Sequence, residues 1–401
     1  MTLRDLASAL PLRPQVRSYA WGSRTAIAEL LGQATPAAEP QAELWMGTHP
    51  GAPSEVRVGD RWRPLSEVAG ELPFLFKMLA AERPLSIQTH PDARQARAGF
   101  EREEAAGIGR DASIRNYRDA NPKPEILFAL TPFHVLRGFR PPVEVADFLQ
   151  ALDLTDLPGA SQLLGAATAE ATLEAFLRAW LETPTATASP WLDRLVGAAR
   201  RPPSETSPEL ALACHWVLRL AEHYPGDRGL LAPLFLEVAT LEPGEALFTG
   251  PRVFHAYLEG CGLELMVSSD NVLRGGLTQK HVDVPELLSV LQFTPEAPGR
   301  SRPTHGAFGE QVFESPGGEL TLTRWAPSPQ IDATIDPGPA GSILLTLSGE
   351  AALEDPVTGQ TLELAQGACV FLPADGRSGL TLRSALPGTV VFQASGRSTA
   401  G

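Results

Sequence analysis

The sequence predicts a mainly β protein that carries one helical insertion. Strand-like runs recur through the first 141 residues, whereas residues 142–227 have apolar side chains at the spacing of amphipathic helices. Strand-and-turn patterns rich in Gly and Pro return after residue 230 and continue almost to the C-terminus. We therefore expect a β region interrupted by a helical module and followed by a second β region.

Composition limits the kinds of partner that the chain can bind. The chain has 401 residues, enough for two or three domains, and it is 43% hydrophobic and 20% charged, as globular proteins are. Its formal net charge of −14 argues against nucleic acid and against an anionic membrane surface as partners. A small anionic substrate would need a local group of Lys and Arg.

The sequence also predicts a cytoplasmic location. Uninterrupted apolar runs stay well short of the ~20 residues that a membrane span needs, and Arg and Pro interrupt the first twenty residues, where a signal peptide would have its apolar core. Cys214, Cys261 and Cys369 are far apart and odd in number. They form neither a disulfide framework nor a thiolate zinc site, and they suit a reducing compartment.

The stretch PLSIQTHPD, residues 84–92, alternates apolar or small side chains with polar ones. In a β-strand this alternation directs Ser86, Gln88 and His90 to one face, and the Pro-Asp pair then ends the strand. A strand with three polar groups on one face is typical of a lined cavity. The alternative is a surface strand with a polar outer face.

Two later strands carry polar residues of a related kind. Lys123 and Glu125 precede an apolar run and share a face if the run is a strand, and His255 lies in a strand after residue 250. Together with Gln88 and His90, these segments supply two imidazoles, one carboxylate and one amide oxygen. Such an N/O set suits zinc or another first-row divalent ion, and the absence of thiolates favours a catalytic metal site.

Other segments are expected to be structural. His49 lacks neighbours at ligand spacing and is interpreted as a loop or structural histidine. Residues 93–120 are charged and Ala-rich, so short helical turns in an exposed excursion, or a solvated linker, are expected. The helical module is expected to be divided by two Pro-rich breaks, TPTATASP and RRPPSETSP.

A weak internal repeat relates the two β regions. Residues 241–258 align with residues 364–381, so that Gly244 matches Gly367 and His255 matches Ser378. Two copies of a strand–turn–strand unit suggest two related all-β barrels, the second without the histidine.

Several motifs resemble those of the type I mannose-6-phosphate isomerase (phosphomannose isomerase) family. They are YAWG, ELWMGTHP, PLSIQTHPD, NPKPEILFALTPF, VFHAYLEG and DNVLRGGLTQK, and they occur in the family's order between about residues 18 and 290. The resemblance implies an isomerase of carbohydrate metabolism that interconverts mannose 6-phosphate and fructose 6-phosphate. It implies one zinc ion held by Gln88, His90, Glu125 and His255, with Arg274 as the essential arginine.

The resemblance also implies the domain organisation. A catalytic cupin (jelly-roll) barrel would comprise residues 1–141 and 228–298, with a helical domain inserted at residues 142–227. Residues 299–401 would form a second, cupin-like β domain without a metal site. One position departs from the family, because Pro122 stands where a His commonly precedes Lys-Pro-Glu.

An aldose–ketose isomerisation needs a base, a stabiliser for a developing oxyanion and an anchor for the phosphate. Arg274 keeps its proton and can only be the stabiliser. Glu264 and Asp270 are the candidate bases, although Glu264 could instead orient His255. The groups expected around phosphate or sugar oxygens are Ser86, Lys123 and Lys280. Gly275 and Gly276 would let the backbone approach a ligand closely.

Two other functions fit parts of the same pattern. Two histidines and a carboxylate also suit an iron-dependent cupin oxygenase, with Gln88 as a bystander. A non-catalytic sugar-phosphate-binding protein would have the same ligands without turnover. For the isomerase we expect a phosphosugar substrate, no nucleic acid or membrane partner, and a monomer.

Overall fold

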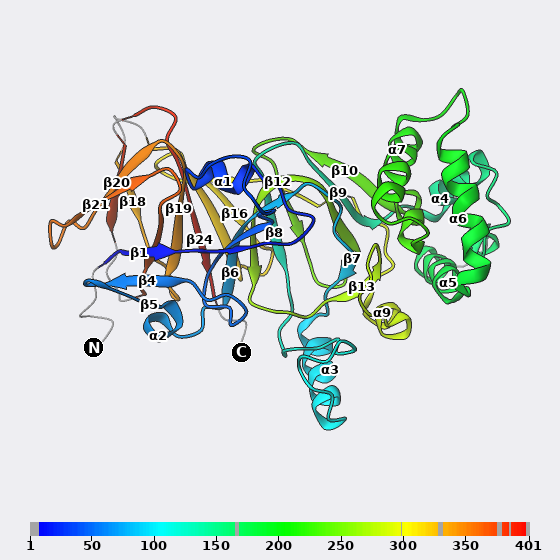
Figure 1. Cartoon of the computed structure of the whole chain (residues 1–401), viewed down its shortest axis with the longest axis horizontal. Helices are drawn as coiled ribbons and strands as arrows, with labels where there is room; N and C mark the ends of the chain where they lie inside the picture. Colours follow the sequence, from blue (N-terminus) through cyan, green and yellow to red (C-terminus); the bar gives the residue numbers. More distant parts are fainter. Residues whose placement is uncertain are drawn as a thin grey trace.

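Two β regions lie side by side, with a helical segment at the far end of the first one (Figure 1). The structure is a computed structural model and describes residues 8–164, 168–297, 299–327, 332–374, 379–384 and 386–397. Strands dominate the described chain, and helices concentrate between residues 142 and 235. The prediction of a mainly β protein that also contains helices is therefore confirmed.

The first β region is an eleven-stranded sheet that surrounds the predicted site. Its main path runs β14 (Arg300–Ser301), β11 (Ala246–Thr249), β8 (Glu125–Ala129), β12 (His255–Val267), β6 (Phe74–Ala81), β3 (Glu43–Met46) and β2 (Gln15–Arg17). Four further strands attach to it: β7 (Ile87–Thr89), β9 (Phe133–Phe139), β10 (Leu236–Leu241) and β13 (Leu273–Gly276).

Strand β12 joins the two parts of this sheet. Its second half pairs with β6 and β8, whereas its first half pairs with β7 and β9. The register shifts between Tyr257 and Glu259, and Gly260 follows at φ +142°, where a Cβ atom would lie 2.7 Å from the Phe133 ring. Gly260 therefore permits the bend that turns both halves of the strand around one interior.

The second β region combines strands from both ends of the chain. A nine-stranded sheet has the order β15 (Thr304–His305), β16 (Gln311–Glu314), β17 (Leu320–Trp325), β24 (Val390–Gly396), β19 (Ser342–Ser348), β22 (Cys369–Leu372), β1 (Leu10–Arg13), β4 (Glu55–Val58) and β5 (Arg61–Pro64). A four-stranded sheet has the order β18 (Ala333–Ile335), β23 (Leu380–Arg383), β20 (Glu350–Glu354) and β21 (Thr361–Ala365). Strand β1 pairs with β22, and β4 and β5 follow β1, so three N-terminal strands extend the C-terminal sheet. Ser378 lies outside the described residues.

The described residues contain nine helices, and those between residues 142 and 223 gather at one end of the first β region (Figure 1). The nine are α1 (Ala26–Leu30), α2 (Leu65–Ala69), α3 (Ala93–Ala105), α4 (Pro142–Ala151), α5 (Ala169–Glu182), α6 (Thr185–Ala199), α7 (Pro208–His223), α8 (Ala232–Phe235) and α9 (Val284–Val290), counted over the ranges given above. Two 3₁₀ turns, η2 (Ala160–Leu164) and η3 (Arg228–Leu231), connect them. Helix α5 buries Leu173, Phe176, Leu177 and Trp180, the spacing of an amphipathic face.

One expected break proved to be a helix. Helix α6 runs through TATASP, with Pro190 inside it. A proline there removes one backbone hydrogen bond. The helix continues because Ala188, Leu192 and Leu195 are buried against its neighbours. The interpretation of this segment as a break was wrong.

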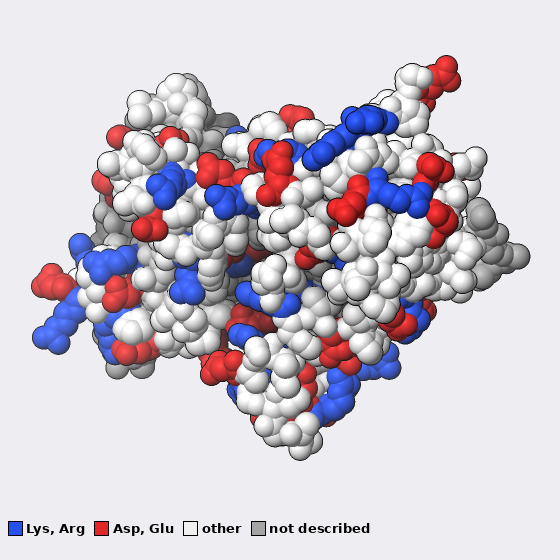
Figure 2. Space-filling model, turned by 45° about the vertical axis from the view of Figure 1, so that its right-hand side comes forward, with Lys and Arg blue, Asp and Glu red and all other residues white. Residues whose placement is uncertain are grey.

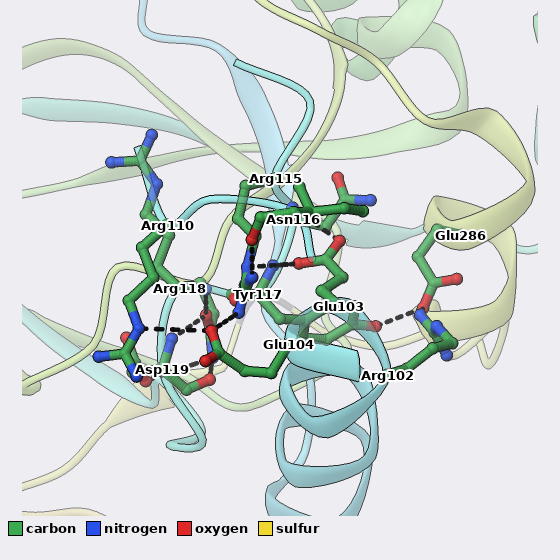
Figure 3. A network of polar contacts seen from close by, with 12 residues as sticks. Arg102, Glu103, Glu104, Arg110, Arg115, Asn116, Tyr117, Arg118, Asp119 and Glu286 are labelled. Atoms are coloured by element: carbon green, nitrogen blue, oxygen red, sulfur yellow. Dashed lines mark hydrogen bonds and ion pairs between the residues drawn. The ribbon is translucent and has the colours of Figure 1, made fainter. Parts of the chain in front are cut away.

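The excursion between residues 93 and 120 is more ordered than expected. Strand β7 ends at Thr89, and Asp92 then caps α3 through a reciprocal capping box with Gln95. Figure 3 shows how the return segment is held: the buried Arg115 contacts Glu103 and Glu104, each at 2.8 Å. The segment is a capped helix followed by a return loop that ion pairs hold against it, and the linker alternative was wrong.

Two further expectations can be compared with the structure. Within the described residues, no helix is long and apolar enough to cross a membrane. All three cysteines are buried and unpaired. The predicted domain boundaries stay predictions.

Candidate active site

His90, Glu125 and His255 form a buried triad whose candidate donor atoms all lie within 4.8 Å of one another. The Nε2 atom of His90 is 3.4 Å from one carboxylate oxygen of Glu125, and the Nε2 atom of His255 is 3.5 Å from the other. Neither Nε2 atom has a hydrogen-bond partner among the described residues. Buried polar atoms without partners are rare. The two imidazole nitrogens and the carboxylate are a set of ligands that suits a metal ion, and a bound ion would satisfy the two nitrogens.

Backbone carbonyls orient both imidazole rings. The Nδ1 atom of His90 lies 2.6 Å from the carbonyl oxygen of Asn271, and Nδ1 of His255 lies 3.0 Å from that of Val253. A carbonyl only accepts, so each Nδ1–H donates and each Nε2 carries a lone pair directed at the centre. Burial also lowers the pKa of His90 to about 4, which keeps the ring neutral. Neutral imidazoles are the form that binds a metal.

Glu125 is ionised despite its burial. Burial alone would raise its pKa, but the Lys123 ammonium, 2.8 Å away, lowers the pKa well below its usual range. The Tyr257 hydroxyl donates to the second oxygen at 3.1 Å. Burial and the neighbouring Glu125 carboxylate raise the pKa of Tyr257, so this hydroxyl keeps its proton. Lys123 lies just before β8, and its ion pair with Glu125 agrees with the expectation that the two side chains face the same way.

Strand register places Gln88 beside the triad. Gln88 is the direct partner of His255 on β12 and of Arg274 on β13. Directly opposed residues on adjacent strands project to the same face. Gln88, His255 and Arg274 therefore form a row across three strands, with His90 two positions along the chain from Gln88. The alternating pattern that placed Gln88 and His90 on one face agrees with this register.

A buried ion pair adjoins the triad. The Lys77 Nζ atom is 2.7 Å from Glu264 and 3.7 Å from Glu43, and all three side chains are buried. Burial alone lowers the pKa of Lys77, but the two carboxylates outweigh it and raise that pKa. The pKa of Glu264 is raised, chiefly by burial, against the opposing charge of Lys77. The contacts of Glu264 and His255 do not support the alternative that Glu264 orients that ring.

Lys77 was not singled out as a site residue from the sequence. The available signal was a lone Lys in the wholly apolar run that became β6, since buried charges are normally paired or functional.

Asp270 is held by His49. The His49 Nδ1 atom accepts a hydrogen bond from the Gly51 amide at 3.1 Å, so its Nε2–H faces Asp270 at 3.3 Å. Burial would raise the pKa of Asp270, but the contact with His49 lowers it, with help from Lys123 and Arg118. Asp270 is thus a weaker base than Glu264. His49 positions a carboxylate, consistent with the structural role expected for it.

Cations gather locally on a surface of mixed charge. Figure 2 shows Lys and Arg interspersed with Asp and Glu over the face it draws. Arg274, Lys280 and Arg118 form no ion pair with a carboxylate of the described chain. Burial, then the charge of Arg118, lowers the pKa of Arg274, and burial with both arginines lowers that of Lys280. These three cations, from two segments of the chain, make a binding region for an anion.

Arg118 was missed because its charged surroundings indicated a linker. The Asn271 side chain accepts from the Arg118 amide at 2.7 Å, which ties this residue to the loop that orients His90. Ser86, expected near the substrate, is half-buried just before β7. Its hydroxyl has no hydrogen-bond partner in the described part of the chain.

A cavity of about 860 Å³ adjoins Asp270. His49, Arg118 and Asp119 contribute to its lining, and so does Arg397 from the second β region. A small polar ligand would fit this volume. The metal triad lies outside the lining, so the cavity leads to the Asp270 side of the site.

Comparison with known proteins agrees with this geometry. Residues 9–142 match the model of the phosphomannose isomerase type I catalytic domain. The mannose-6-phosphate isomerase of Salmonella typhimurium is 37% identical over 386 residues, which cover 90% of this chain and 93% of the relative. The human mannose-6-phosphate isomerase is 32% identical, with coverage of 93% and 95%.

Solved structures are also similar. The Salmonella typhimurium mannose 6-phosphate isomerase, crystallised with fructose 6-phosphate and zinc, superposes with a TM-score of 0.85 at 35% identity and covers 98% of this chain and 100% of its own. A zinc-bound mannose 6-phosphate isomerase gives the same TM-score, identity and coverage. The chain belongs to the type I mannose-6-phosphate isomerase family.

Proposed function

We propose that the chain interconverts mannose 6-phosphate and fructose 6-phosphate as a zinc-dependent aldose–ketose isomerase, an intramolecular oxidoreductase of carbohydrate metabolism. The observation that carries the proposal is the buried His90–Glu125–His255 triad with two unpartnered imidazole nitrogens. The names of the relatives and the zinc and fructose 6-phosphate in a similar structure support it.

Gln88, His90, Glu125 and His255 would hold the zinc ion. The two Nε2 lone pairs and the ionised carboxylate face one point, and the register of Gln88 brings an amide to the same face. When bound, zinc would supply a Lewis acid that polarises sugar oxygens.

Glu264 is the base that we propose. The reaction moves a proton between adjacent carbons through an enediol(ate), so the base must accept a proton from carbon and return it to the neighbouring carbon. A raised pKa brings a carboxylate closer to the working pH and makes it a better base. Glu264 has this property, whereas the pKa of Asp270 is lowered. Lys77 holds Glu264 in place at 2.7 Å.

Arg274 stabilises the negative charge that develops on oxygen. It stands opposite Gln88 in the register and so faces the metal site with a charge that it does not lose. We assign the phosphate to Lys280 and Arg118, and the sugar oxygens to Ser86 and Lys123. With Pro122 at the family's usual histidine position, the chain has no acid–base group there.

We also propose the finer architecture. The first β region would be a catalytic cupin barrel with residues 142–227 as an inserted helical domain, and residues 299–401 would be a cupin-like domain without metal. The odd, unpaired cysteines favour the cytoplasm, and a monomer is proposed.

The alternative functions explain fewer of these features. An iron-dependent oxygenase needs two histidines and a carboxylate but has no need for three unpaired cations beside them. A non-catalytic binding protein has no need for a base with a raised pKa next to the metal site.

The test is an isomerase assay of the purified protein before and after chelation. The metal-loaded protein should form fructose 6-phosphate from mannose 6-phosphate, and chelation should abolish this conversion. Absence of conversion by the loaded protein would reject the proposal. Oxygen consumption with bound iron would favour the oxygenase, and tight substrate binding without turnover would favour the binding protein.

A further inference from the structure

The end of the helical segment contacts two segments of the active site. The Tyr224 hydroxyl, directly after α7, donates to the carbonyl oxygen of Pro84 at 2.7 Å, two residues before Ser86. The next turn, η3, is tied back to the helices, because Trp180 donates to the Arg228 carbonyl at 3.2 Å. Residues 224–231 are therefore fixed to the helices on one side and to the site on the other.

Asp227 makes the second of these contacts. One carboxylate oxygen accepts from the Gly229 amide at 2.7 Å and from the Leu277 amide at 2.8 Å. The other accepts from the Thr278 amide at 3.3 Å, and the Thr278 hydroxyl accepts from the Lys280 amide at 3.0 Å. A single carboxylate thus holds the turn that connects Arg274 to Lys280.

The backbone of this turn requires such a restraint. Leu277 has a φ of +52°, which leucine rarely adopts, while its side chain is buried. A Cβ atom on Gly276 would lie 2.8 Å from the Cα atom of Gly229. Gly276 therefore lets the backbone approach the end of the helical segment closely. The expectation that Gly276 lets the backbone approach a ligand is not supported.

We infer that Asp227 is a positioning residue through which the helical segment directs Lys280 toward the phosphate of the substrate. The inference rests on the proposed function and assigns the helical segment a part in substrate binding. Without the carboxylate, the Leu277 and Thr278 amides lose their acceptor and the turn relaxes from its left-handed conformation. Lys280 would remain in the chain but would no longer be held toward the phosphate, whereas Arg274 would keep its place opposite Gln88 in the strand pairing.

Three variants separate this role from simple capping of η3. Asp227→Ala removes every acceptor. Asp227→Ser keeps an N-cap for Gly229, since serine is a good N-cap, but its side chain is too short to reach the turn. Asp227→Asn keeps the oxygen that bridges Gly229 and Leu277. Ser207→Ala is the matched control, because Ser207 caps α7 in the same helical segment and has no contact with residues 276–280.

The readouts are bound zinc, thermal stability, kcat and KM for mannose 6-phosphate, and the Kd for inorganic phosphate from calorimetric titration. Asp227→Ala and Asp227→Ser should raise both KM and Kd by about tenfold, the loss of one charge-assisted hydrogen bond, with full zinc and a much smaller change in kcat. Asp227→Asn should have KM and Kd values close to those of the wild-type protein, and Ser207→Ala should leave both unchanged.

The inference would be overturned if Asp227→Ser had the KM and Kd of the wild-type protein. An unchanged phosphate Kd in folded Asp227→Ala would overturn it too. If Asp227→Ala does not fold, the comparison of KM and Kd between Asp227→Ser and Asp227→Asn still tests the inference. A wild-type protein without isomerase activity would reject the proposed function, while the phosphate titration would still test Asp227. Failure of wild-type protein to bind phosphate would overturn the inference as well.

Discussion

The two β regions contain a similar strand–turn–strand unit and bury different side chains. The turns between β10 and β11 and between β21 and β22 have glycines with positive φ at matching positions, Gly244 at +95° and Gly367 at +80°. The first unit leads into β12 with His255, whereas the matching position of the second is Ser378. A shared local geometry therefore supports two different interiors.

The interiors differ in charge. The first β region buries two histidines, two lysines and three glutamates: His90, His255, Lys77, Lys123, Glu43, Glu125 and Glu264. The core that the nine-stranded and four-stranded sheets share in the second region is apolar and includes Trp325, Ile335, Leu344, Leu353, Leu364 and Leu380. Burial of a charge is costly unless the charge is paired, and a paired charge is often no more stabilising than an apolar one. The charged interior is better explained by chemistry than by stability.

The largest effect should come from Glu125→Gln. The amide is nearly isosteric but lacks the charge that balances Lys123 and holds the metal, so bound zinc should be lost and isomerase activity should fall to the assay background. The matched change in the second region is Asp355→Asn, a buried carboxylate there, which should keep zinc and kcat. Elemental analysis and the isomerase assay measure both. If Glu125→Gln kept its zinc and its activity, the charged interior of the first region would not be needed for metal binding, and the proposed difference between the two regions would be wrong.

Glu264→Gln should keep zinc but lower kcat by about 10²–10⁴, the usual value of one general base. The raised pKa of Glu264 also predicts the pH profile: this base works only after losing its proton, so kcat should rise with pH through a pKa above the ordinary glutamate value. The variant should lack this low-pH limb. If kcat of the variant still rose with pH in the same range, another group would be responsible for this part of the profile.

Arg274→Ala should lower kcat by about 10²–10³ with metal content and fold retained, because a preorganised charge near the reacting oxygen is lost. Arg274→Lys should recover part of the loss by keeping the charge. Turnover at the wild-type level in Arg274→Ala would exclude the assigned role.

Arg118→Ala should have the smallest effect, a rise in KM of about three- to tenfold at low ionic strength that diminishes with added salt, as expected for an exposed charge. Arg97→Ala is the control in the same excursion, since Arg97 is exposed on α3 and is not among the residues that line the cavity. Equal KM values for the two variants would mean that Arg118 does not contact the phosphate.

Local patterns predicted much of this site. Alternation in residues 85–90 was enough to place Gln88 and His90 on one face, and the apolar spacing of residues 142–227 predicted a helical segment. Helix α6 was missed because its Pro and Thr residues are typical of breaks, while tertiary burial of Leu192 and Leu195 outweighed that preference.

Long-range contacts could not be predicted. The Lys77–Glu264 pair joins residues 187 positions apart, and Asp227 acts on backbone amides that any residue would supply. The pairing of β1 with β22, through which β4 joins the C-terminal sheet, likewise depends on packing between distant segments. The periodicity of a short stretch of sequence does not predict contacts between segments that are far apart in the chain.

Zinc titration of the metal-free protein tests the central claim most directly. If the charged interior is a metal-dependent isomerase site, activity should increase in proportion to added zinc and reach a plateau at one zinc per chain. Activity that is independent of zinc, or a protein that binds one zinc per chain without forming fructose 6-phosphate, would contradict the account.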